Sequence, residues 1–220
     1  MASQKDLMYR KQSAKMVNHL RKRGITDEQV LTAMESTPRH KFVAAGMEFQ
    51  AYEEKALPIG FGQTISHPYT VALMSQVLQV QKGQRIMEIG TGSGYQAAVL
   101  CRMGAQVFTI EKNTSLSRLA EKRLKSMNCH FVIRTGDGSL GWQSYAPFDA
   151  IIVTAGAPVV PRNLLQQVKE GGRLLIPVGT AASQELTLFV KDEQSSFRKI
   201  IIENLNFVPL KGVDGWSEEV

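Results

Sequence analysis

The residues that most constrain this chain are 86–95, which read I-M-E-I-G-T-G-S-G-Y. They begin as a short apolar strand and continue as a turn with glycine at every second position. Residues 96–100 then read as the start of a helix, and a second apolar strand, 107–110, is followed directly by Glu111. A strand, a glycine-rich turn, a helix and an acidic residue closing the next strand are the parts of a nucleoside-binding α/β unit.

The details of this turn discriminate between nucleoside ligands. The dinucleotide fingerprint G-x-G-x-x-G has a third glycine for close helix packing, but Tyr95 stands at that position here. Glu88, just before the first glycine, would repel a pyrophosphate but suits the ammonium and sulfonium groups of S-adenosylmethionine. Glu111 follows the first glycine by about 20 residues, where an acid accepts hydrogen bonds from ribose hydroxyls. The pattern therefore predicts S-adenosyl-L-methionine as cofactor rather than NAD or FAD.

Composition predicts one globular domain over residues 1–220, with 43% hydrophobic and 21% charged residues. The polar N-terminus lacks the apolar core of a signal peptide, and no run of about 18 apolar residues predicts a membrane span. Cys101 and Cys129 lack the CxxC spacing of a metal or redox site, and no metal-ligand cluster is evident. Two reduced thiols fit a cytoplasmic location.

The net charge of +6 permits nucleic-acid binding without establishing it. Part of the excess falls on one predicted helix, over residues 5–23, in Arg10, Lys11, Lys15, Arg21, Lys22 and Arg23. No aromatic residues interleave with these charges to stack on bases. We therefore interpret them as a solvated helix face and do not expect a nucleic-acid partner.

Residues 1–80 are predicted to form a helical cap that carries an active-site loop. A helix over 5–23 ends at Gly24, and a capping box at residues 26–29, T-D-E-Q, predicts a second helix that begins at Asp27 and stops at Pro38. Residues 57–66 are rich in turn formers and are predicted as a loop. A third helix is predicted from about His67, with proline in its first turn.

From residue 81 the chain is predicted to be the cofactor-binding α/β core. Strands are expected over 85–89, 106–110, 130–134, 149–153 and 173–178, with helices over 94–103, 115–127 and 162–169. Gly171 and Gly172 are expected to end the last of these helices. Two further strands, 185–191 and 197–203, predict antiparallel edge strands. The fold class is thus α/β, a doubly wound, mostly parallel sheet with an N-terminal helical extension, as in Rossmann-like S-adenosylmethionine-dependent methyltransferases.

A second unusual segment, residues 62–69, reads G-Q-T-I-S-H-P-Y. Ser66 is placed to cap the third helix, and with the helix N-terminus it would also form a small anion pocket. A hydroxyl at a helix start can serve both roles, so the two interpretations stand together.

In these segments the chain resembles the protein-L-isoaspartate O-methyltransferase family, also called protein-β-aspartate methyltransferases. The matching segments follow in order along nearly the whole chain, at 56–60, 63–66, 87–96, 136–138, 147–154, 171–179 and 207–210. The glycine turn is shared by many methyltransferases, whereas L-P-I-G followed by Q-T-I-S is much more specific to this family.

The resemblance implies an activity: methyl transfer from S-adenosylmethionine to the free carboxylate of L-isoaspartyl residues in damaged peptides and proteins, which starts repair through a succinimide. It also implies roles for single residues, with Ser66 as the active-site serine. The implied cofactor-binding residues are Thr64, Ile65, Ser66, His67, Glu88, Gly90, Thr91, Gly92, Ser93, Gly94, Glu111, Asp137 and Gly138. Of these, Asp137 and Gly138 would contact the adenine. The implied substrate-binding residues are Thr154, Ala155, Pro158, Phe207, Val208, Pro209 and Leu210. The partners would be isoaspartyl peptides and unfolded or flexible protein segments.

Some positions depart from the family pattern. Phe61 replaces a residue that is often polar in bacterial members, and His67 stands where glutamine or alanine is frequent. The tail from Val213 to residue 220 matches no pattern that we can place. These departures concern the preference for peptide sequence and not the reaction.

The chemistry agrees with a site that lacks a general base. A carboxylate has a pKa near about 4 and is already ionised at neutral pH, so its attack on a methyl group needs no proton removal. His67 therefore has no proton to take, and His40 is expected to be a surface residue.

Two rival functions are a nucleic-acid or small-carboxylate methyltransferase on the same fold and a non-catalytic cofactor-binding module. Residues 154–158, T-A-G-A-P, lack the aromatic residue that would stack on a base.

Overall fold

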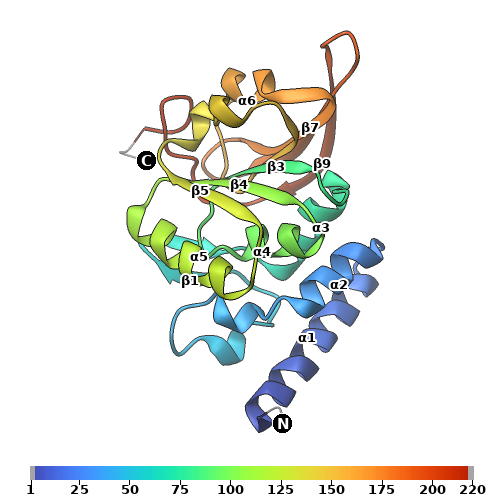
Figure 1. The fold of residues 1–220 in the computed structure, drawn as a ribbon, viewed down its shortest axis with the longest axis vertical. Helices are drawn as coiled ribbons and strands as arrows, with labels where there is room; N and C mark the ends of the chain where they lie inside the picture. The colour runs from blue at the N-terminus through green and yellow to red at the C-terminus, as the bar shows by residue number, and fades with distance from the viewer. Residues whose placement is uncertain (1–2, 218–220) are drawn as a thin grey trace.

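The computed structural model describes residues 3–217. It places a central sheet between layers of helices, with the N-terminal helices below the sheet in Figure 1. The helices are α1 (Gln4–Lys22), α2 (Glu28–Ser36), α3 (Pro68–Leu78), α4 (Tyr95–Arg102), α5 (Thr114–Ser126) and α6 (Arg162–Gln166), with 3-10 turns η1 (Arg39–Lys41), η2 (Glu48–Gln50), η3 (Gly138–Leu140) and η4 (Gln143–Tyr145). The strands are β1 (Leu57–Gly60), β2 (Gln63–Ile65), β3 (Arg85–Ile89), β4 (Gln106–Glu111), β5 (Phe131–Thr135), β6 (Phe148–Val153), β7 (Val168–Gly179), β8 (Gln184–Lys191) and β9 (Phe197–Leu205).

The large sheet has the strand order β5-β4-β3-β6-β7-β8-β9. Strands β3 to β7 are parallel, while β8 pairs antiparallel with β7 and β9 with β8. The chain runs outward from β3 through β4 to β5, and then returns to the other side of β3 as β6. This reversal is the topological switch point where open α/β sheets bind ligands. The predicted fold class, including the antiparallel edge strands, is confirmed.

Both faces of the central strands β3, β4 and β6 are buried, as expected for parallel strands covered on two sides. Ile86 faces a cluster that includes side chains of α1 to α5, whereas its neighbour Met87 faces a second cluster with Trp142, Leu164 and Leu210. Because side chains of a strand alternate, successive apolar residues supply both cores. The central strands are thereby fixed between two layers, and their carboxyl ends remain accessible to a ligand.

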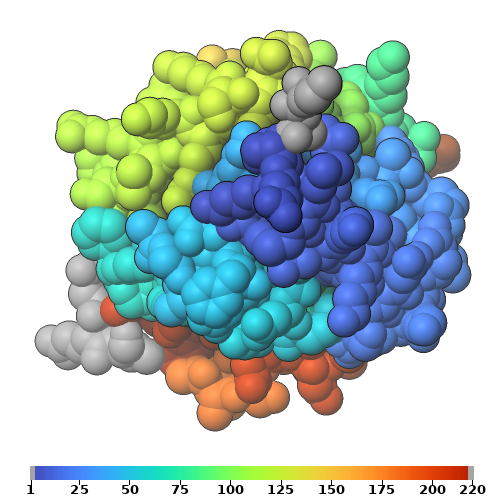
Figure 2. All heavy atoms as spheres, turned by 90° about the horizontal axis from the view of Figure 1, so that it is seen from below, coloured from blue at the N-terminus to red at the C-terminus, as the bar shows by residue number. Residues whose placement is uncertain are grey.

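The N-terminal residues cover much of one face of the molecule, as the blue and cyan spheres of Figure 2 show. Here the prediction of a loop over 57–66 was wrong: β1 and β2 form an antiparallel hairpin in which Leu57 pairs with Ile65. Leu57, Ile59 and Ile65 point inward and are buried. The alternation of buried and exposed residues is that of a strand, but the segments are too short for the sequence pattern to reveal it.

The predicted start of α2 also differs. The cap of α2 is Asp27, whose carboxylate accepts hydrogen bonds from the amides of Gln29 and Val30, and not Thr26. The Thr26 amide instead donates to the Gln76 side chain. A capping box that the sequence analysis did not predict begins α1, between Ser3 and Asp6.

Gly171 and Gly172 do not end a helix, because α6 stops at Gln166 and both glycines lie inside β7. The register between β6 and β7 shifts beside them, between Phe148 and Ala150. A Cβ at Gly172 would lie 2.8 Å from the carbonyl oxygen of Asp149, so glycine is needed for the strands to meet. Gly171 and Gly172 therefore allow the irregular pairing of β7 with β6.

The basic residues of α1 are exposed, as predicted. His40 is half-buried: its ring stacks on Tyr9 with centroids 3.8 Å apart, and its Nδ1 lies 2.8 Å from the Tyr52 hydroxyl. Burial lowers the pKa of His40.

Cys101 and Cys129 are half-buried free thiols. Within residues 3–217, no helix has the length and apolar character needed to cross a bilayer.

Candidate active site

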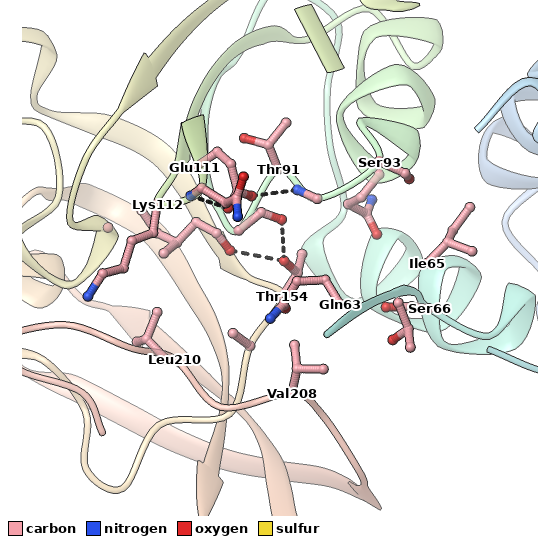
Figure 3. A pocket seen from close by; sticks show the side chains of 18 of the residues that line it. Gln63, Ile65, Ser66, Thr91, Ser93, Glu111, Lys112, Thr154, Val208 and Leu210 are labelled. Carbon is pink, nitrogen blue, oxygen red and sulfur yellow. Dashed lines mark hydrogen bonds between the residues drawn. The ribbon is translucent and has the colours of Figure 1, made fainter. Parts of the chain in front are cut away.

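A cavity of about 370 Å³ opens at the carboxyl ends of β3, β4 and β6. Its walls are the β1–β2 hairpin, the glycine turn after β3, the residues after β4 and β6, and residues 208–211 near the end of the chain. Figure 3 shows Ile65 and Ser66 at one end of this cavity, Lys112 at the other, and Val208 and Leu210 along one side. The cavity has the size of a small-molecule site.

The glycine turn follows β3 and adopts a backbone that favours glycine, with φ +93° at Gly90 and +53° at Gly92. The Thr154 hydroxyl donates to the Gly90 carbonyl over 2.6 Å, so the end of β6 holds the turn in place. A Cβ at Gly90 would lie 2.6 Å from that hydroxyl oxygen. The turn therefore keeps its backbone exposed toward the cavity only with glycine at this position.

Glu111 ends β4 and faces the cavity from beside the turn (Figure 3). One carboxylate oxygen accepts the Gly92 amide over 2.7 Å, and the other accepts the Asn113 amide over 2.9 Å. Each oxygen has a second lone pair, so the carboxylate can still accept two hydroxyl groups of a bound ribose. The hydrogen bonds from the two backbone amides fix the direction in which the carboxylate would accept these hydroxyl groups.

Glu88 does not lie on the cavity wall. It is fully buried beneath the turn, where its Oε2 accepts the Thr109 hydroxyl over 2.5 Å. The Thr109 hydroxyl lies 2.5 Å from that of Thr91 in the turn, and Glu88 Oε1 has no hydrogen-bond partner within residues 3–217. Burial raises the pKa of Glu88 to about 8, so the carboxyl is largely protonated at neutral pH. Glu88 thus supports the turn from below, which differs from the direct attraction of a cation expected from sequence.

Ser66 lines the cavity directly after β2. The residue that caps α3 is His67, whose Nδ1 accepts the Tyr69 amide, and so the expectation that Ser66 caps this helix was wrong. Burial lowers the pKa of His67, which favours the neutral ring that this bond requires. The segment turns into the helix one residue later than predicted, and the Ser66 side chain remains beside the cavity.

Arg39 holds the Ser66 backbone from behind. Its Nη2 donates to the Ser66 carbonyl over 2.6 Å and its Nε to the Ala51 carbonyl over 2.7 Å. The guanidinium is fully buried and lies 4.7 Å from the centre of the Tyr95 ring. A buried cation costs free energy unless its donors are satisfied; the two carbonyls and the aromatic face offset part of this cost, while Nη1 has no hydrogen-bond partner within residues 3–217.

The structure brings most of the predicted site residues together on the cavity wall. These are Thr64, Ile65, Ser66, Gly90, Thr91, Gly92, Ser93, Glu111, Gly138, Thr154, Ala155, Val208, Pro209 and Leu210. The predicted residues outside the wall are His67, Glu88, Gly94, Asp137, Pro158 and Phe207. Gly94 faces α5, where a Cβ would lie 3.3 Å from that of Ala120.

Asp137 is committed to other parts of the chain. One carboxylate oxygen accepts the Ser139 amide and hydroxyl, and the other accepts the Val213 amide over 2.7 Å. Burial acts to raise the pKa of Asp137, but these hydrogen bonds prevail and lower it. The predicted adenine contact of this side chain therefore competes with the tail, whose residues 218–220 lie outside the described part of the chain.

The sequence analysis missed several residues of the wall. They are Phe61, Gln63, Val71, Met74, Ile89, Tyr95, Gln96, Ile110, Lys112, Asn113 and Lys211. Lys112 and Asn113 follow Glu111 directly, so their position at a strand end was a usable signal. Val71 and Met74 lie on α3 and reach the cavity only because of the way this helix packs in the fold. No local sequence pattern indicates that packing.

A parallel sheet with its switch point at β3, a glycine turn at that point and an acidic residue at the end of the next strand form a nucleoside-binding site. Tyr95, in place of the third glycine of the dinucleotide fingerprint, indicates the class of S-adenosylmethionine-dependent methyltransferases. The comparisons with known proteins go further. The family model for protein-L-isoaspartate(D-aspartate) O-methyltransferase matches residues 11–215.

Two curated relatives are named protein-L-isoaspartate O-methyltransferase. The one from Pelodictyon phaeoclathratiforme is 46% identical over 206 residues, 93% of each chain, and the one from Christiangramia forsetii is 48% identical over 196 residues, 89% of this chain and 92% of its own. A Plasmodium falciparum structure of this description, in complex with S-adenosyl-L-homocysteine, aligns with TM-score 0.80 and 25% identity over 90% of this chain and 97% of its own. The chain belongs to the protein-L-isoaspartate O-methyltransferase family.

Proposed function

We propose that the cavity beside Ser66 is where this methyltransferase moves a methyl group from S-adenosylmethionine to the free carboxylate of an L-isoaspartyl residue. The resulting ester starts repair through a succinimide. One observation carries the assignment of the site: the glycine turn, Glu111 and the serine of the Q-T-I-S segment come from three separate parts of the chain and line one cavity.

The cavity wall suits the cofactor. Glu111 would hold the ribose hydroxyls, and the exposed backbone of the glycine turn would lie against the amino-acid part. S-adenosylmethionine supplies a methyl group on a positively charged sulfur. A Cβ at Gly138 would lie 2.4 Å from a methyl carbon of Ile89, so the wall is tight at the segment that the resemblance assigns to the adenine. In the Plasmodium falciparum relative the bound group is the demethylated product of this cofactor.

The residues around Ser66 would orient the substrate and need not activate it. The isoaspartyl carboxylate arrives ionised, so orientation in line with the methyl group is the main task. We assign its hydrogen bond to the Ser66 hydroxyl, with the segment held by Arg39 through the Ser66 carbonyl. Because the Ser66 carbonyl is held in place, the hydroxyl of the same residue would also have a defined position.

The substrate would lie between the hairpin and the segments after β6 and β9. Gly156 donates its amide to the Val208 carbonyl over 2.8 Å and accepts the Leu210 amide over 2.8 Å, which joins the two segments beside the cavity. A peptide that enters such a site must be extended, so flexible or unfolded protein segments are the proposed partners. The cytoplasm remains the predicted location.

The test uses labelled S-adenosylmethionine and two peptides that differ only in carrying aspartate or isoaspartate. We expect transfer to the isoaspartyl peptide alone. Ser66→Ala should lower kcat at least tenfold while the Kd for S-adenosylhomocysteine changes less than twofold. Ser126→Ala, in a remote exposed turn of α5, is the control and should match the parent protein.

Two results would contradict the proposal. Equal losses of catalysis and cofactor affinity in Ser66→Ala would remove the orienting role of the hydroxyl. Cofactor binding without transfer to either peptide would leave the fold intact and make small carboxylates and RNA the next substrates to assay.

A further inference from the structure

The tip of the β1–β2 hairpin carries an aromatic residue in an unfavourable backbone conformation. Phe61 and Gly62 form the two-residue turn, with φ +56° and +68°, and Gly60 before them has φ +93°. Two successive positive φ values are those of a type I′ turn, which prefers Asn-Gly. A bulky side chain with positive φ is uncommon and strained, and such strain concentrates at functional sites.

The ring of Phe61 is exposed although it lines the cavity. Its exposed fraction is 57%, whereas Leu57, Ile59 and Ile65 of the same hairpin are nearly buried. Ile59 reaches to 3.5 Å from where a Cβ at Gly92 would stand, so the hairpin rests on the glycine turn. The inner face of the hairpin therefore fixes the tip relative to the cofactor site, while the ring at the tip remains open to contact.

Phe61 has apolar neighbours on the wall, beside the polar Gln63 and Thr64 of its own hairpin. Val208 and Pro209 line the cavity together with Phe61. The charged side chains on the wall, Glu111, Lys112 and Lys211, belong to segments other than the hairpin. Contact between an exposed aromatic ring and an apolar group of a ligand is favourable, because both apolar surfaces are removed from water.

We infer that Phe61 is a specificity-determining residue: its ring packs against a large apolar side chain directly beside the isoaspartyl residue of the substrate peptide. The inference rests on the proposed function, because it assumes that the peptide enters along Ser66. The occupant follows from the placement of the two residues, since Phe61 and Ser66 stand before and after β2 and line the one cavity into which an extended peptide would enter.

The test compares three isoaspartyl peptides that have serine on both sides, leucine before, or leucine after the isoaspartyl residue. The parent enzyme should use one leucine peptide about tenfold better in kcat/KM, mainly through a lower KM. Phe61→Asn should reduce that preference to about twofold or less, whereas Phe61→Tyr should retain it. Because asparagine suits the turn, Phe61→Asn should also raise the thermal midpoint by about 2–4 °C.

Phe49→Asn is the matched control, since Phe49 is 60% exposed in η2 and is not among the residues that line the cavity. It should keep the full preference for the leucine peptide. A parent enzyme that methylates all three peptides equally, or a Phe61→Asn variant with undiminished preference, overturns the inference and leaves the proposed function standing. Failure to methylate any isoaspartyl peptide would overturn both.

Discussion

Single residues of the site depend on partners that face away from the cavity. Glu88, Thr109 and Thr91 form one short hydrogen-bonded chain from β3 through β4 to the glycine turn. The same low-dielectric surroundings that strengthen these bonds make the ionised form of Glu88 costly. A protonated Glu88 is therefore part of the folded support of the turn.

The pH dependence of stability should reveal this proton. The folded protein keeps it up to about pH 8, whereas the unfolded chain releases it near the ordinary value of 4.5. Between these values the folded state binds more protons, so Glu88 makes stability fall as pH rises, by up to about 1.4 kcal/mol per pH unit. Glu88→Gln should remove that contribution, measured as the free energy of unfolding in urea at pH 5, 6, 7 and 8.

The control is Glu185→Gln, because this exposed carboxylate lies on β8 and faces Lys199 at 3.8 Å. It should retain the parental slope. Identical slopes in the two variants would show that Glu88 is ionised in the folded protein at neutral pH.

At the scale of elements, buried polar contacts set the position of segments that have little regular structure. Arg39 in η1 joins the Ala51 carbonyl near η2 to the Ser66 carbonyl after β2. The planar guanidinium can serve both acceptors at once, and an ammonium group cannot reproduce its geometry. The loop that leads to α3 is thus held from two directions by one side chain.

Arg39→Lys should therefore destabilise the fold by about 1–3 kcal/mol, the cost of leaving a buried acceptor unpaired. It should also lower kcat more than it changes the Kd for S-adenosylhomocysteine, because the displaced segment carries Ser66. Urea denaturation and single-turnover transfer measure the two effects. Arg118→Lys, on the exposed face of α5, should change neither, and a stable but catalytically normal Arg39→Lys would refute the positioning role.

The elements also differ in how far the sequence could predict them. Strands such as β3 and β4 are apolar runs closed by glycine or an acid, so local signals agree with the tertiary fold. The hairpin escaped prediction because its strands are only four and three residues long and its turn has phenylalanine where asparagine is usual. Gly171 and Gly172 look like a helix stop, and only the shifted pairing with β6 gives them another purpose.

The residues of the site also differ in how far the sequence could predict their positions. The glycine turn and Glu111 follow from the strand ends that position them, so sequence spacing predicts their place on the wall. The direction of the Asp137 side chain depends on the Val213 amide, 76 residues later in the chain, and no local pattern contains that partner. Phe207 likewise turns to the core because the Gln184 side chain holds its amide.

At the scale of the whole molecule, the cap and the α/β core share one hydrophobic cluster. It contains Leu20 of α1, Met34 of α2 and Met74 of α3 together with Ile86 of β3 and Leu186 of β8. Segments that bury the same side chains cannot unfold independently without exposing them. The division at residue 80 therefore marks a change of pattern in the sequence, and thermal unfolding should give a single transition by circular dichroism and by tryptophan fluorescence.

Cofactor binding should stabilise this single unit, because the cavity wall comes from the hairpin, the strand ends and the C-terminal segment alike. S-adenosylhomocysteine at 100 times its Kd should add about 2.7 kcal/mol and raise the midpoint by roughly 5–11 °C. Glu111→Ala removes the acceptor assigned to the ribose, so at the same ligand concentration its midpoint should rise far less above its own ligand-free value. Glu121→Ala on α5 should show the full shift, and an undiminished shift in Glu111→Ala would mean that the ribose lies elsewhere.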